Sequence, residues 1–114
     1  MRLRERSITI IFPVFNDYNI EIVVSSDAMK SRQKRNSVYG KYEGLFSALH
    51  SFNGLGNACI IFPEKNYGLV DVAHECCHAV HAMMDWASVE DQECLAYHMG
   101  YLTKQVYDFV RKKK

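Results

Sequence analysis

Residues 69–86, LVDVAHECCHAVHAMMDW, separate into an apolar and a polar half when they are placed on a helix at about 100° per residue. The apolar arc holds small, branched and flexible side chains: Val72, Cys76, Cys77, Ala79, Val80, Met83 and Met84. The opposite arc holds histidines and acids but no lysine or arginine: Asp71, His74, Glu75, His78, His81 and Asp85. A surface helix normally fills such an arc with lysine and glutamate, so this composition favours a metal site or a cleft.

The polar arc contains an HExxH motif, His74-Glu75-Cys76-Cys77-His78. Two histidines four residues apart lie one turn apart on the same side of a helix, so both imidazoles can reach one cation. Glu75 follows about 100° round the helix, where it can take a proton from metal-bound water without being a ligand. We therefore expect His74 and His78 to bind Zn²⁺ and Glu75 to act as the general base. The other interpretation is that all three are ordinary polar residues of an exposed helix.

A catalytic zinc site needs a third protein ligand and one open position. We expect Glu93 to be that ligand, because it begins ECLAY on a separate helix after a short turn at about residues 87–88. Ala96 and Gly100 are small and one turn apart, which predicts that another helix approaches closely at the level of Glu93. Glu93 could instead be an ordinary first-turn acid favoured by the helix dipole, with Glu90 and Asp91 as the alternative ligands.

Other polar side chains near the motif have less defined roles. Tyr97 lies one turn after Glu93 and could donate a hydrogen bond to a developing oxyanion, or simply pack. His81 is expected to support a ligand or to lie on the surface, and Asp85 to orient an imidazole or to cap the helix end. No zinc-binding role is predicted for the cysteines, which lie on the apolar arc, in a strand or beside Glu93 pointing elsewhere: Cys59, Cys76, Cys77 and Cys94.

The first half of the chain predicts a small sheet. Ser7–Phe15 and Asn19–Val24 are β-prone and are expected to form a hairpin, and Asn57–Phe62 is expected to form a third strand. The apolar spacing in Leu45–Phe52 predicts a short helix. Ala28–Ser37 has no clear apolar stripe and is interpreted as a loop or a short exposed helix.

The last helix is expected to begin near Val89, with Ser88 as its N-cap and Asp91 at nearly capping-box spacing. Together these segments predict one α+β domain spanning residues 1–114. Its small, mostly antiparallel three-stranded sheet would pack against the HExxH helix and the C-terminal helix.

Composition narrows the class of protein. A formal net charge of +1 over 114 residues argues against a chain built to bind nucleic acid, although basic residues cluster at Lys30–Arg35. No uninterrupted apolar run is long enough to span a bilayer. The four cysteines are too few and too irregular for a disulfide framework, so a reducing cytoplasm is the expected location.

The HExxH motif followed by Glu93-Cys94-Leu95-Ala96 resembles the gluzincin branch of the zincin metallopeptidases, over roughly residues 57–105. In size the chain is similar to short HExxH proteins carried by phages or prophages. The resemblance implies a minimal zincin-like peptidase in which zinc and Glu75 hydrolyse peptide bonds of a peptide or protein substrate. It also implies that the strand Ala58–Phe62 is an edge strand that binds extended substrate backbone.

An alternative function remains open at this point. With no large subdomain after Glu93, the chain has little material for a deep specificity pocket. It could therefore be a non-catalytic protein-binding module that retains a zincin-type zinc site. Nothing in the sequence indicates the oligomeric state.

Overall fold

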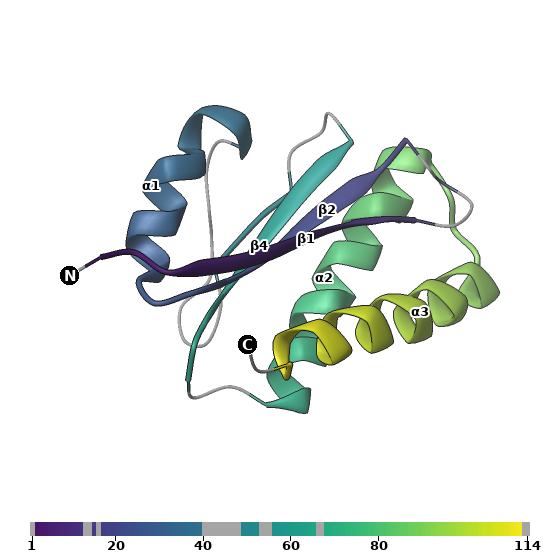
Figure 1. Ribbon diagram of the computed structural model, residues 1–114. Coiled ribbons are helices and arrows are strands. Elements are labelled where there is room, and N and C mark those ends of the chain that lie inside the picture. The colour runs from purple at the N-terminus through teal and green to yellow at the C-terminus, as the bar shows by residue number, and fades with distance from the viewer. Residues whose placement is uncertain are drawn as a thin grey trace.

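Two pairs of strands are each followed by helices in the computed structural model, which describes residues 2–12, 15, 17–39, 49–52, 56–65 and 68–112 (Figure 1). Within these residues the elements, in chain order, are β1 (Glu5–Ile11), β2 (Asn19–Ser25), α1 (Ala28–Tyr39), β3 (Leu49–Phe52), β4 (Asn57–Pro63), α2 (Leu69–Ala87) and α3 (Gln92–Val110). None of the helices described is long and apolar enough to cross a membrane.

The strands form one sheet in the order β1-β2-β4-β3. β1 pairs with β2 and β3 pairs with β4 in antiparallel orientation, whereas β2 and β4 are parallel. The prediction of an α+β fold with a mostly antiparallel sheet is therefore confirmed. The β1–β2 pairing is the hairpin expected from the two β-prone segments.

The sheet has one strand more than predicted, because part of a predicted helix is a strand. The helix expected over Leu45–Phe52 is wrong for residues 49–52, which form β3 against β4; residues 45–48 lie outside the described residues. The predicted third strand is confirmed as β4, but β4 has a neighbour on each side. The edge position expected for Ala58–Phe62 is thus occupied by β3.

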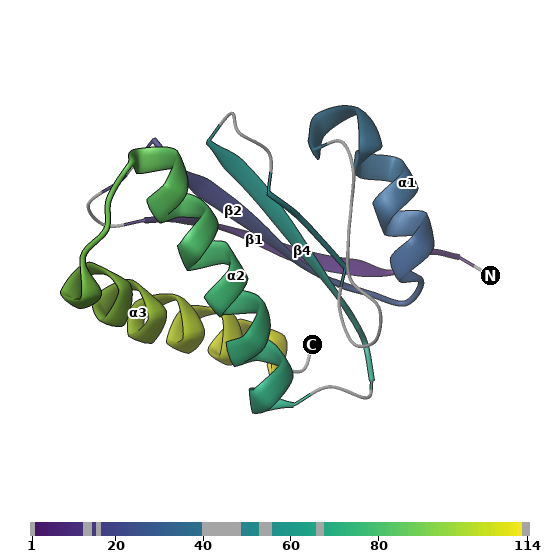
Figure 2. The same ribbon diagram turned by 180° about the vertical axis from the view of Figure 1, so that it is seen from behind.

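Helices cover both faces of the sheet, and Figure 2 shows α1 on one side with α2 and α3 on the other. Because side chains alternate along a strand, one set from β2 and β4, including Ile20, Ile22 and Ile60, joins the core beneath α2 and α3. The other set packs towards Ala28 of α1: Val23, Cys59 and Ile61. Covering on both faces explains why β4 is apolar almost throughout.

The end of α2 and the start of α3 differ from the sequence prediction. Ser88, the expected N-cap of the last helix, instead ends α2 in the left-handed conformation with φ of 58°. The N-cap of α3 is Asp91, whose side chain accepts a hydrogen bond of 2.9 Å from the Glu93 backbone N–H. α2 therefore runs to Ala87 and α3 begins at Gln92.

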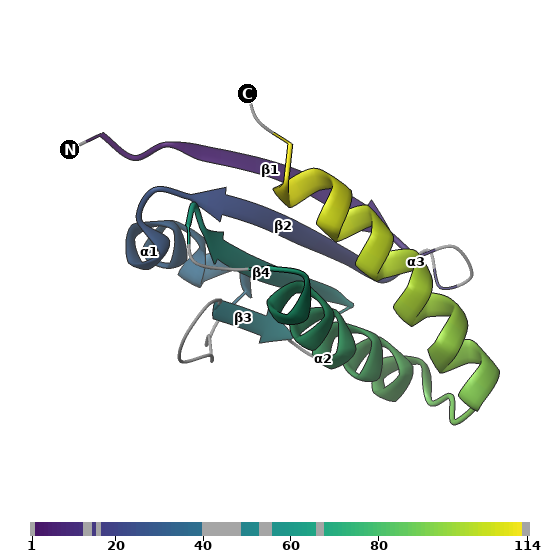
Figure 3. The same cartoon turned by 90° about the horizontal axis from the view of Figure 1, so that it is seen from below.

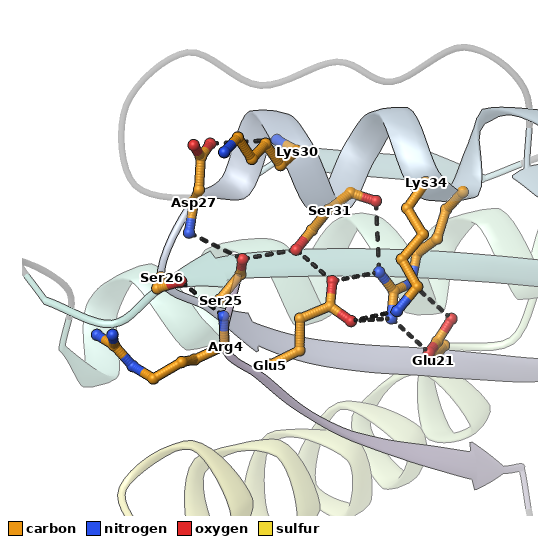
Figure 4. A network of polar contacts seen from close by, with 10 residues as sticks. Arg4, Glu5, Glu21, Ser25, Ser26, Asp27, Lys30, Ser31 and Lys34 are labelled. Carbon is orange, nitrogen blue, oxygen red and sulfur yellow. Dashed lines mark hydrogen bonds and ion pairs between the residues drawn. The ribbon is translucent and has the colours of Figure 1, made fainter. Parts of the chain in front are cut away.

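A polar network joins α1 to the sheet (Figure 4). The segment interpreted as a loop or an exposed helix is a helix that buries Ser31 and Arg35. The Arg35 guanidinium donates to Glu5 at 2.6 Å and to Glu21 at 3.2 Å, and the Ser31 hydroxyl also donates to Glu5. Part of the basic cluster at Lys30–Arg35 thus has a structural role.

The network predicts acid sensitivity. The hydrogen bond from Arg35 lowers the pKa of the Glu5 carboxyl from 4.5 to about 2. A carboxyl with a lowered pKa in the folded state stabilises the protein above pH 4.5, and this contribution is lost as the pH falls from 4.5 towards 2. We expect Glu5→Gln to lower the free energy of unfolding at pH 7 by about 3 kcal/mol and to flatten its pH dependence in urea titrations.

The matched control is Glu64→Gln. Glu64 pairs with Arg4 at 3.2 Å, but both side chains are largely exposed. This substitution should change stability by less than about 1 kcal/mol at either pH. Equal effects of the two substitutions would contradict the role assigned to the buried network.

Arg6 of β1 caps the end of α3. Its guanidinium donates to the carbonyl oxygens of Phe109 and Val110, each at 3.1 Å, and lies 4.9 Å from the centre of the Phe109 ring. The last carbonyls of a helix have no partner within the helix, so Arg6 satisfies groups that would otherwise need water.

We expect Arg6→Leu to lower the free energy of unfolding by about 1–2 kcal/mol, because two charge-assisted hydrogen bonds are lost. Arg6→Lys should recover only part of this, since an ammonium lacks the fork of a guanidinium. Lys104→Ala, which removes an exposed pair with Asp108, is the control and should leave stability almost unchanged. Thermal unfolding measures all three, and an Arg6→Leu variant as stable as the control would contradict the assignment.

Candidate metal centre

The two histidines of the HExxH motif converge on one point. His74 and His78 lie one turn apart on α2 and both are exposed, because the opposite arc of the helix is buried against the sheet. Their Nε2 atoms are 3.2 Å apart, and their rings meet edge to face with centroids 4.8 Å apart. The helix thus presents two imidazole nitrogens to the same place, as the spacing predicts.

This separation fits zinc. Zinc binds imidazole nitrogen at about 2.0–2.1 Å with tetrahedral angles, which places two such nitrogens roughly 3.3 Å apart. The observed separation of 3.2 Å between the two Nε2 atoms is close to this value. The donor type, the spacing and the exposure of both rings therefore suit a zinc ion bound from the solvent side.

Glu75 is buried beside this pair. Only 6% of its surface is exposed, and its Oε1 lies 2.8 Å from Nδ1 of His50 on β3. The His50 ring also packs against the His78 ring, with centroids 5.2 Å apart. By sequence Glu75 falls on the polar arc of the helix. In the structure its side chain is buried where α2 meets β3 at the edge of the sheet.

Sequence reasoning did not single out His50. It lies in the segment whose apolar spacing indicates a helix, and it is not part of any motif. Only the pairing of β3 with β4, which puts His50 opposite Ile60, brings it next to α2. A prediction of strand pairing would have been needed to find it.

The structure does not bring Glu93 to the two histidines. Glu93 is exposed in the first turn of α3, and α2 continues nine residues beyond His78 to Ala87, about 13 Å along its axis. α2 and α3 lie on the same face of the sheet (Figure 3). Thr103, late in α3, hydrogen-bonds Cys76 in the N-terminal half of α2. Within the described ranges, no three His, Cys, Asp or Glu side chains form a group that could hold a metal ion.

The face of α3 that carries Glu93 is open to solvent. The close helix approach expected at Ala96 and Gly100 is wrong: both residues are exposed, and a Cβ added at Gly100 would meet no atom within 4 Å. Tyr97 is 56% exposed and stacks on Tyr101 with ring centroids 6.5 Å apart. Tyr97 therefore does not lie among the residues around Glu75.

The remaining acids and His81 also lie apart from the cluster. His81 and Asp85 are exposed on later turns of α2, and Glu90 is exposed in the turn before α3. Asp91 is engaged as the N-cap of α3. Among these four residues, Asp91 is the one whose side-chain hydrogen bond gives it a structural role, as the N-cap of α3.

The cysteines do not add ligands to the cluster. All four are free thiols, and Cys76 is buried in the core on the side of α2 away from the two exposed histidines, where burial raises the pKa of its thiol to about 12. Cys94 lies 3.6 Å from Nδ1 of His98, but that nitrogen donates to the Cys94 carbonyl at 2.8 Å. His98 therefore cannot take the Cys94 proton with Nδ1, which leaves a Cys/His nucleophile pair unsupported.

Comparison of this chain with protein-family models, with curated proteins and with solved structures finds no match.

The geometry predicts which histidines bind metal. We expect the purified protein to bind one zinc ion and His78→Ala to lose it, because a single imidazole cannot replace the converging pair. His81→Ala is the control, since His81 lies on the same helix outside the pair, and it should keep zinc. Metal analysis and calorimetric titration measure both, and full zinc content in His78→Ala would rule out the pair as the site.

Proposed function

We propose that this chain is a zinc-dependent peptidase of a minimal, gluzincin-like kind. The observation that carries the proposal is the convergence of the His74 and His78 Nε2 atoms at 3.2 Å beside the buried carboxylate of Glu75. Two ligands and a base on one helix are part of the arrangement that metal-assisted hydrolysis needs, and a third ligand would complete it.

Each residue has a separate role in this proposal. His74 and His78 would hold the ion through Nε2. Zinc in such a site supplies Lewis acidity, which polarises a carbonyl and lowers the pKa of water towards about 7. Glu75 would take the proton of the attacking water on its carboxylate and deliver it to the leaving amine. Its burial keeps bulk water from competing for that proton.

The proposed substrate is an extended peptide or a flexible segment of a protein. β3 is the last strand in the order β1-β2-β4-β3 and carries His50 next to Glu75. An extended chain can pair with the outer edge of a sheet through its backbone, independently of its side chains. A substrate bound along β3 would therefore lie beside the two histidines and the base.

Glu93 remains the third ligand that the gluzincin resemblance proposes. To reach the histidines it would have to come down from the far end of α2, so α3 would have to change position on binding zinc. The Glu93→Gln variant tests whether Glu93 binds zinc. A loss of zinc affinity of tenfold or more means that α3 moves to bring Glu93 to the ion, whereas unchanged affinity means that Glu93 is not a ligand and stays exposed.

The proposed location is the cytoplasm, and the proposed partner is a peptide or protein substrate. The described cysteines are all unpaired thiols, which suits the reducing cytoplasm. Neither nucleic acid nor a membrane is a proposed partner, because the net charge is only +1 and the basic cluster at Lys30–Arg35 contributes Arg35 to the buried network.

Glu75→Gln tests the function. We expect zinc content to stay unchanged and cleavage of a fluorogenic peptide library to fall by roughly 10²–10⁴-fold, because the amide cannot accept the proton. Glu90→Gln, an exposed acid outside the cluster, is the control and should cleave like the wild type. Full activity in Glu75→Gln, or no cleavage by the zinc-loaded wild type, would defeat the peptidase proposal.

A second candidate is a non-catalytic protein-binding module that keeps the zinc site. It is favoured by the exposed positions of Glu93 and Tyr97, two residues expected to take part in the catalytic site, away from Glu75. In that case zinc would bind and be lost in His78→Ala, but Glu75→Gln would have no activity to remove. The same variants therefore separate the two functions.

A further inference from the structure

His50 connects the edge strand to the proposed base. Its side chain is 16% exposed and that of Glu75 is 7% exposed, and their Nδ1 and Oε1 atoms are 2.8 Å apart. A hydrogen bond between two nearly buried groups is stronger and more directional than one in water. It therefore fixes the position of the Glu75 carboxylate more firmly than helix geometry alone can.

The chemistry of this contact assigns the donor. A carboxylate accepts hydrogen bonds, so Nδ1 of His50 carries the hydrogen and donates it to Oε1 of Glu75. The hydrogen bond described at Glu75 engages Oε1, which leaves Oε2 to exchange a proton with a reacting group. A base held by one oxygen and reacting with the other keeps a constant geometry through the reaction.

The same ring also touches a proposed metal ligand. The His50 and His78 rings lie 5.2 Å apart at an interplanar angle of 33°. His50 thus contacts both the base and one of the two histidines that would hold zinc. These contacts reach the site from β3, the strand along which a peptide would lie, and not from the HExxH helix itself.

We propose that His50 is a positioning residue: it orients the Glu75 carboxylate through Nδ1 and couples the edge strand that binds the peptide to the base. This inference rests on the proposed peptidase function. A peptide that pairs with β3 would thereby be held in register with Glu75.

Two substitutions of His50 separate positioning from packing. Asn places an N–H donor near the position of Nδ1, whereas Leu keeps the bulk and removes the donor. We expect His50→Leu to lower kcat by roughly 10–100-fold with little change in KM, and His50→Asn to recover most of the loss. Zinc affinity should stay within about threefold of wild type in both, with His81→Leu as the control.

A readout without turnover tests the contact itself. In nitrogen-15 spectra of the zinc-free protein, Nδ1 of His50 should carry a hydrogen bonded to Glu75, and its signal should shift in Glu75→Ala but not in Glu90→Gln. The signals of His50 are assigned by their loss in His50→Asn. This measurement succeeds or fails independently of any peptide cleavage.

Several outcomes would overturn the inference. Loss of zinc in both His50 variants would make His50 a metal ligand, and wild-type kcat in His50→Leu would show that Glu75 needs no such support. Equal loss of kcat in His50→Asn and His50→Leu would mean that the N–H donor at the position of Nδ1 has no role. If the wild type cleaves nothing, the peptidase proposal fails, whereas a cleaving wild type with an Nδ1 signal unaffected by Glu75→Ala defeats this inference alone.

Discussion

The packing of α2 against the sheet determines the direction in which the two histidines point. One side of the helix is fully buried on the sheet face that contributes Ile22 and Ile60. Each of its larger apolar side chains contributes roughly 1.5–3 kcal/mol when buried. A rotation of α2 by one residue would move this side out of the core, so the orientation of His74 and His78 is set by apolar burial and not by the site.

This dependence explains which features could be predicted. The HExxH spacing and the apolar arc are patterns within one segment, and a helix of 19 residues displays them over several turns. The apolar runs of β2 and β4 are likewise local patterns. The histidine pair, the motif helix and most of the sheet therefore follow from the sequence alone.

Features that depend on two segments meeting could not be predicted in this way. The apolar side chains of Leu49 and Phe52 suit a helix turn as well as a strand, and pairing with β4 decides between them. His50 acquires its contact with Glu75 only through that pairing. The prediction that Ser88 is the N-cap of the last helix is also wrong. Ser88 ends α2 in the left-handed conformation, and Asp91, three residues later, begins α3. This shift leaves Glu93 at the end of α2 that is farther from His74.

The Arg6 contact has a consequence for how the chain folds during synthesis. Arg6 leaves the ribosome well before its acceptors Phe109 and Val110, which follow it by 103 and 104 residues. β1 can pair with β2 early, but its guanidinium stays without these partners until α3 is complete. Contacts of such long range slow folding, because a large loop must close before they form. A nascent chain stalled before residue 109 would therefore leave the Arg6 guanidinium without both acceptors, and completion of the last turn of α3 would supply them.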